Sequence, residues 1–168
     1  MMMRQDTTSD ATGEVLIAAV RRHGPFDGWS EKALLAAADE CAVETAAMHR
    51  AFPRGASSLI QYHAARIDRC MEEGLGGTEA LKGMGVRQRI AAAVRLRLEL
   101  EQSNREAVRA ALAYCAMPQN AGLSLTCLYH TVDTVGFAIG DKSTGFNFYS
   151  KRALLAEAYG ATPRAWAV

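Results

Sequence analysis

The sequence predicts an all-α fold, a helical bundle of roughly eight helices, from three features of its pattern. Apolar residues recur at steps of three and four over several stretches, which is the spacing of a helix buried along one side. Glycine and proline interrupt these stretches where helices would end. No stretch alternates between apolar and polar residues as a half-buried strand would.

Four helices are expected in the N-terminal part of the chain. The first should bury Val15, Ala18 and Ala19 and end at the following Gly-Pro pair. Ser30 has the right position and chemistry to cap the second helix. The expected helices cover residues 11–22, 31–41, 44–51 and 56–73.

Four more helices are expected after a glycine-rich stretch. In the first of them, Arg97 and Glu101 are spaced for i,i+4 pairing on a face that we expect to be solvated. Ser103 and Glu106 form the S-x-x-E pattern of a capping box at the start of the next. The expected helices cover residues 86–102, 103–118, 120–140 and 146–159.

The glycine-rich stretch is also the best candidate for a boundary between two parts of the chain. Residues 1–73 are predicted to form an N-terminal helix-turn-helix-like module and residues 86–168 a helical ligand-binding domain, with residues 74–85 as the hinge.

Composition excludes several classes of partner. Nineteen basic and eighteen acidic residues leave a formal net charge of +1, so no strong overall field favours nucleic acid or a membrane surface. The four cysteines form no C-x-x-C pair and are expected to be reduced core residues. With no apolar leader and no run of about 20 apolar residues, a cytoplasmic protein is expected.

No motif for catalysis or for a metal or other cofactor is present, so the sequence does not predict an enzyme. G-x-S-x-G and H-E-x-x-H are both absent. His130 and Asp133, at i,i+3, are interpreted as a local helix contact, and His63 as a core histidine with its hydrogen bonds satisfied.

The two short helices within residues 31–51, followed by Phe52 and a long helix, have the layout of a helix-turn-helix. This layout resembles the N-terminal domain of TetR-type repressors, and a TetR-type ligand-sensing transcription regulator is therefore the alternative function. The candidate recognition segment 44–50 contains Arg50, His49 and one acidic residue, which is a weak set for binding phosphates. Nucleic-acid binding is accordingly not expected.

In a TetR-like architecture the later helices enclose an apolar pocket, and their apolar seams are the candidate lipid-binding residues. The alternative is that these side chains simply fill a core, and periodicity alone favours that alternative. The candidate residues are Val108, Leu112, Cys115, Leu125, Leu128, Val132, Val135 and Ile139.

Several segments resemble a known family. The run 140–155, Gly-Asp-Lys-Ser-Thr-Gly-Phe-Asn-Phe-Tyr-Ser-Lys-Arg-Ala-Leu-Leu, together with residues 118–133, 25–30 and 51–55, resembles the coenzyme Q (ubiquinone) biosynthesis "Coq nine" family. The resemblance implies a TetR-like fold that binds an isoprenoid lipid or quinone intermediate. It also implies delivery of that intermediate to a di-iron demethoxyubiquinone hydroxylase, or contact with other ubiquinone-biosynthesis proteins.

The chain departs from the family pattern at Gly136, Gly145 and Phe148, where relatives usually have tryptophan, aspartate and tryptophan. Relatives also continue into further helices beyond Val168, so the resemblance implies a diverged and C-terminally short member. Peripheral contact with the inner membrane and a homodimer are both left open by this comparison.

The last expected helix has more aromatic residues than one buried stripe can cover. Phe148, Tyr149 and Arg152 lie within one turn of one another and are predicted to form an exposed partner-binding patch. The alternative is that both aromatic side chains point into the core.

Overall fold

The computed structural model describes residues 11–22 and 28–140, and every regular element in these two ranges is helical. The all-α prediction is therefore confirmed. After the first helix, at residues 11–22, the elements are α2 (Glu31–Glu40), α3 (Thr45–Ala51), α4 (Ala56–Gly74), α5 (Gly77–Ala80), α6 (Val86–Leu100), α7 (Arg105–Cys115) and α8 (Ala121–Ala138). The expected helix at 146–159 lies outside the described residues.

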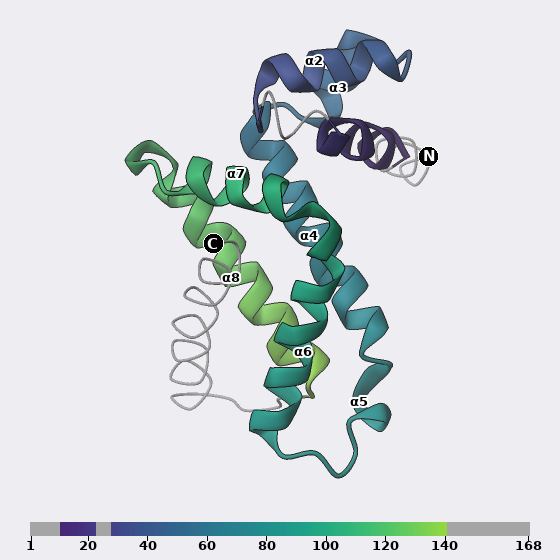
Figure 1. Cartoon of the computed structure of the whole chain (residues 1–168), viewed down its shortest axis with the longest axis vertical. Helices are drawn as coiled ribbons and strands as arrows, with labels where there is room; N and C mark the ends of the chain where they lie inside the picture. Colours follow the sequence, from purple (N-terminus) through teal and green to yellow (C-terminus); the bar gives the residue numbers. More distant parts are fainter. Residues whose placement is uncertain (1–10, 23–27, 141–168) are drawn as a thin grey trace.

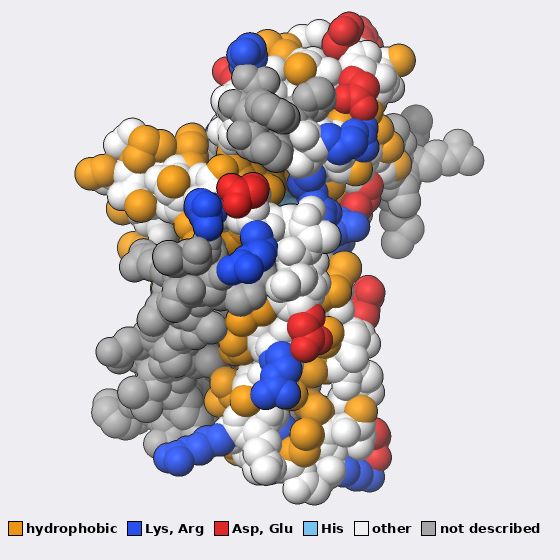
Figure 2. Space-filling model, viewed as in Figure 1, with side chains coloured by type: hydrophobic (Ala, Val, Ile, Leu, Met, Phe, Trp, Pro, Cys, Tyr) orange, Lys and Arg blue, Asp and Glu red, His pale blue; other side chains and the backbone are white. Residues whose placement is uncertain are grey.

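The long helix α4 is the axis of the molecule (Figure 1). The helices before it gather at its N-terminal end, α6 and α8 pack along its C-terminal part, and α7 lies near its middle. On the face shown in Figure 2, apolar side chains gather where α7 meets α8, and charged side chains of both signs are scattered over the rest.

The core consists of two clusters of buried apolar side chains, and α4 contributes to both. Leu59 and Ile60 of α4 pack in the first cluster with Leu16, Phe52 and Ala107, the last of these from α7. The second cluster is formed by residues of α6 and α8 and by the C-terminal ends of α4 and α5. Its buried members are Met71, Leu75, Leu81, Ala93, Val132, Val135, Ala138 and Ile139. The helix α4 therefore packs in both clusters and connects the two ends of the bundle. The predicted division of the chain at 74–85 remains a prediction.

Polar contacts tie α7 to the N-terminal helices. The indole N–H of Trp29 donates a 2.6 Å hydrogen bond to the carbonyl of Ala107, and both residues are buried. Arg21 Nε donates to Asn104 Oδ1 at 3.0 Å, just before α7 begins. These bonds hold α7 in place over the middle of α4.

Local signals at helix ends were predicted with mixed success. Ser30 caps α2 as expected, accepting a 3.1 Å hydrogen bond from the Ala33 N–H. The capping box at Ser103 is wrong, because residues 102–104 form a 3-10 turn and α7 begins at Arg105 without a side-chain cap. Asn104 occupies the cap position, but its side chain bonds to Arg21 and Ser103 instead. A tertiary contact therefore competes with the local one.

The expected buried face of the first helix is only partly right: Ala19 is buried as predicted, but the other two residues are not. Val15 and Ala18 are exposed, whereas Leu16, Ile17 and Val20 are fully buried. Residues 15–20 are all apolar, so the sequence offers several faces and the packing partners decide which one is buried.

The turn between α2 and α3 contains a residue with unfavourable backbone geometry. Ala42 has φ of +52°, in the left-handed region that glycine adopts without steric cost. We therefore expect Ala42→Gly to raise the free energy of unfolding by about 0.5–1 kcal/mol in urea denaturation.

The matched control is Ala46→Gly, in the exposed first turn of α3. The same exchange at a right-handed helical position should lower stability by up to about 1 kcal/mol. Equal effects at the two positions would show that the backbone of Ala42 is not strained.

Candidate functional site

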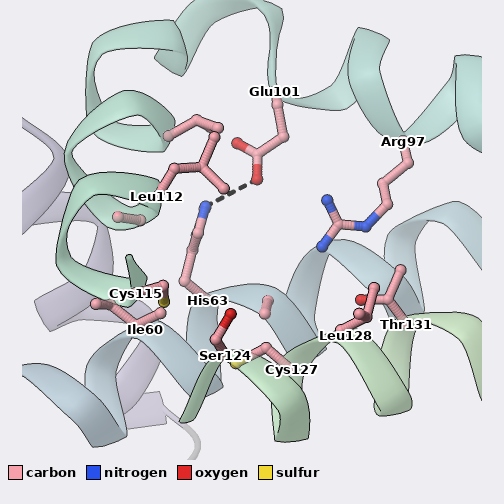
Figure 3. A pocket seen from close by; sticks show the side chains of 13 residues that line it. Ile60, His63, Arg97, Glu101, Leu112, Cys115, Ser124, Cys127, Leu128 and Thr131 are labelled. Carbon is pink, nitrogen blue, oxygen red and sulfur yellow. Dashed lines mark ion pairs between the residues drawn. The ribbon is translucent and has the colours of Figure 1, made fainter. Parts of the chain in front are cut away.

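A pocket of about 160 Å³ lies between α4, α6, α7 and α8 (Figure 3). Helices far apart in the sequence therefore form its walls, and no short motif could have located it. It is lined by Ile60, His63, Ala64, Arg97, Glu101, Val108, Ala111, Leu112, Cys115, Ser124, Cys127, Leu128 and Thr131.

Most of the wall is apolar, and α7 supplies the largest share. Val108, Ala111, Leu112 and Cys115 follow the i, i+3, i+4, i+7 spacing that places side chains on one face of a helix. Leu128 of α8 lines the pocket as well. This part of the pocket is suited to a hydrophobic ligand or to a hydrophobic part of one.

One region of the lining is polar and deeply buried. His63 of α4 and Glu101, directly after α6, point toward one another in Figure 3 and are only 5% and 4% exposed. His63 Nε2 lies 2.9 Å from Glu101 Oε1. Both imidazole nitrogens and Glu101 Oε2 lack a well-oriented hydrogen-bond partner among the described residues. The contact is therefore a close electrostatic pairing that leaves hydrogen-bonding capacity unused.

The surroundings of Glu101 favour its ionised form. Burial alone would raise the pKa of this carboxyl, but contact with His63 and the charges of Arg97 and Arg21 outweigh burial. The pKa of Glu101 therefore lies below its ordinary value, and the pocket contains a buried carboxylate.

A second buried acid organises the adjoining wall. Asp68 of α4 accepts a 2.7 Å hydrogen bond from Arg97 Nε on α6 and a 2.8 Å hydrogen bond from the Thr131 hydroxyl on α8. All three residues are buried, and Arg97 and Thr131 line the pocket. This carboxylate connects the three helices at one level of the bundle.

The structure corrects the expected solvated face of α6. Arg97 and Glu101 are buried, and each makes its ion pair with α4. The i,i+4 spacing of Arg97 and Glu101 does not distinguish pairing within one helix from pairing with a neighbouring helix. Asp68 was missed as well, although it follows Ile67 on the buried side of α4.

The four cysteines are free thiols, as predicted, but each is half-buried and none belongs to the fully buried core. Burial, together with the charges of Cys115 and Asp68, raises the pKa of Cys127 to about 11, although Arg97 opposes this change. Burial also raises the pKa of Cys115. These two thiols stay protonated at neutral pH and act as small apolar wall residues.

The structure separates the eight predicted lipid-binding residues into three groups. Val108, Leu112, Cys115 and Leu128 line the pocket. Val132, Val135 and Ile139 are buried in the second core cluster, and Leu125 is 67% exposed. The apolar seam along α8 is thus continuous in sequence, but only part of it lines the pocket, because α8 contacts different neighbours at its two ends.

The predicted partner-binding residues Phe148, Tyr149 and Arg152 lie outside the described residues. Within the described part of the chain, no group of three or more potential ligands is arranged to hold a metal ion. Nor does any helix there combine the length and apolar character that a membrane crossing requires.

The fold and pocket define a class: an all-helical protein with a helix-turn-helix layout at its N-terminal end and a small pocket that is apolar on one side and polar on the other. Residues 121–167 match the family model COQ9. These residues include α8, which forms one wall of the pocket.

The curated relatives agree with the family match. The chain is 31% identical over 156 residues to the human "Ubiquinone biosynthesis protein COQ9, mitochondrial" and 28% identical over 152 residues to the Drosophila melanogaster protein of the same name. These matches cover 88% of this chain and 48% and 46% of the relatives. The chain thus spans about half the length of the curated relatives it matches. It is a relative of the COQ9 proteins, which confirms the predicted resemblance.

The Asp68 contacts predict a large loss of stability when the carboxylate is removed. Asp68→Ala removes a buried carboxylate that is hydrogen-bonded to both Arg97 and Thr131, and it should lower the free energy of unfolding by about 3 kcal/mol or more. Thr131→Val removes one hydrogen bond to the buried carboxylate and preserves shape, so it should cost less, about 1.5–2 kcal/mol. Chemical denaturation measures both, and a similar small loss in the two variants would contradict the central role of Asp68.

Glu101 predicts a dependence of stability on pH. Because its pKa is lowered by folding, the stabilisation is complete above the ordinary value of 4.5 and is lost as pH falls through the lower folded-state pKa. Glu101→Gln should therefore flatten the acid limb of a stability-versus-pH curve.

Glu99→Gln is the control, since Glu99 is exposed on the same helix. It should leave the slope of the acid limb unchanged. An acid limb equally steep in wild type and in Glu101→Gln would show that this carboxylate does not drive the pH dependence.

Proposed function

We propose that the protein is a lipid-binding accessory protein of ubiquinone biosynthesis that presents a quinone intermediate to a hydroxylase and performs no catalysis of its own. The observation that carries this proposal is the pocket between α4, α6, α7 and α8. Its apolar wall on α7 suits a hydrophobic ligand, and its His63–Glu101 end suits a polar head.

The relatives support the pathway. They are named as mitochondrial ubiquinone biosynthesis proteins, and the region they share with this chain includes the helices that form the pocket. Quinone intermediates of that pathway combine a polar ring with an apolar tail, which matches a pocket with both kinds of wall. The proposal also includes the hydroxylase as the partner protein and a location at a membrane surface. The residues proposed to contact the hydroxylase are Phe148, Tyr149 and Arg152.

The test is whether lipid binding depends on the volume of this pocket. Ala111→Leu, on the pocket side of α7, should reduce both the lipid that copurifies and the affinity for a short-chain ubiquinone analogue by about tenfold or more, because the added side chain occupies the cavity. Solvent extraction with native mass spectrometry and a quinone titration give the two readouts.

Ala113→Leu is the matched control, since Ala113 is exposed on the same helix two residues away. It should bind lipid like the wild type. Wild-type protein that carries no lipid and has no affinity for isoprenoid quinones would remove the proposal, and equal binding by the two variants would place the ligand elsewhere.

A further inference from the structure

The size of the pocket restricts what can enter it. An apolar cavity of roughly 150 Å³ in a protein can hold one benzene molecule. At about 160 Å³ this pocket has room for a single ring, with any long tail passing out of it. The ring would lie between the apolar side chains of α7 and the polar pair His63 and Glu101.

The polar pair has unused hydrogen-bonding capacity inside the pocket. Glu101 Oε2 is buried and receives no hydrogen bond from the described residues. An ionised carboxylate can only accept hydrogen bonds, so its complement must be a donor. The nitrogens of His63, which also lack well-oriented partners, offer donor or acceptor capacity beside it.

A hydroxyl group is the simplest group that meets both requirements. Its hydrogen can be donated to Glu101 Oε2 while its oxygen accepts from the His63 ring. An ether or a quinone carbonyl can only accept and would leave Oε2 unsatisfied. A ligand carboxylate would place a second anion beside Glu101, which repulsion disfavours.

We infer that this pocket selects an aromatic ring bearing a hydroxyl group, a phenol or hydroquinone, over rings that carry only acceptors, with Glu101 and His63 as the selecting residues. The inference rests on the proposed function and deepens it: a reduced or phenolic intermediate is bound in preference to the oxidised quinone.

The experiment compares two probes by isothermal titration against the full chain. These are 4-hexylphenol and 1-fluoro-4-hexylbenzene, which have the same ring and tail and differ in having O–H or fluorine. The phenol should bind about tenfold or more tightly, although it is the less hydrophobic of the two, because only the phenol donates a charge-assisted hydrogen bond.

Variants test which residue is responsible for the preference for the phenol. Glu101→Gln should reduce the preference for the phenol severalfold, since a neutral amide oxygen is the weaker acceptor, whereas Glu99→Gln on the exposed face of α6 should keep it. Should Glu101→Gln fail to fold, the wild-type comparison still decides whether the pocket selects a hydroxyl group.

The outcomes separate the two proposals. Equal binding of both probes, lost in Ala111→Leu, would leave lipid binding in this pocket intact and overturn the selection for a hydroxyl group, as would happen if water satisfied the carboxylate. No binding of either probe, together with no bound lipid, would overturn both. A preference for the phenol that survives in Glu101→Gln would overturn the role of Glu101.

Discussion

The buried carboxylate of Asp68 is the interaction on which the geometry of the bundle depends. It accepts hydrogen bonds from Arg97 and Thr131, so α4, α6 and α8 meet at one fixed level. A buried guanidinium requires a partner, and that requirement sets the rotation of α6 about its own axis. The same rotation turns Glu101, four residues further on, toward His63. The polar end of the pocket is thus a consequence of the Asp68 contacts.

The pocket lies where the two core clusters meet along α4. Ile60 belongs to the first cluster, and Leu128 packs against the second, yet both line the pocket. The helix α7 completes the wall and is held by the Trp29 hydrogen bond to Ala107 and by Arg21 on Asn104. The N-terminal helices therefore shape the pocket through α7, and the helix-turn-helix layout serves as support for this wall. A change in the packing around Trp29 would be transmitted to Ala111 and Leu112 through a single short helix.

The polar pair shows a trade-off between stability and binding. Oε2 of Glu101 and both ring nitrogens of His63 lack well-oriented partners among the described residues. This lowers the free energy of unfolding, because water is largely removed from both side chains. The nearby positive charges of Arg97 and Arg21 reduce that cost and keep the carboxylate ionised. Such a group gains most from a ligand that supplies the missing hydrogen bond, which is the physical basis of selectivity by unsatisfied groups.

The sequence by itself determined the helical class, most helix bounds, the Ser30 cap and the family resemblance, because period, capping and punctuation act over a few residues. Only the tertiary structure decided which faces are buried: Leu16 and Ile17 in place of Val15 and Ala18, and Arg97 and Glu101 in the interior. Their partners Asp68 and His63 lie 29 and 38 positions earlier in the chain. Spacing along one helix contains no information about a partner on another, so the pocket and its polar end emerge only when the helices pack.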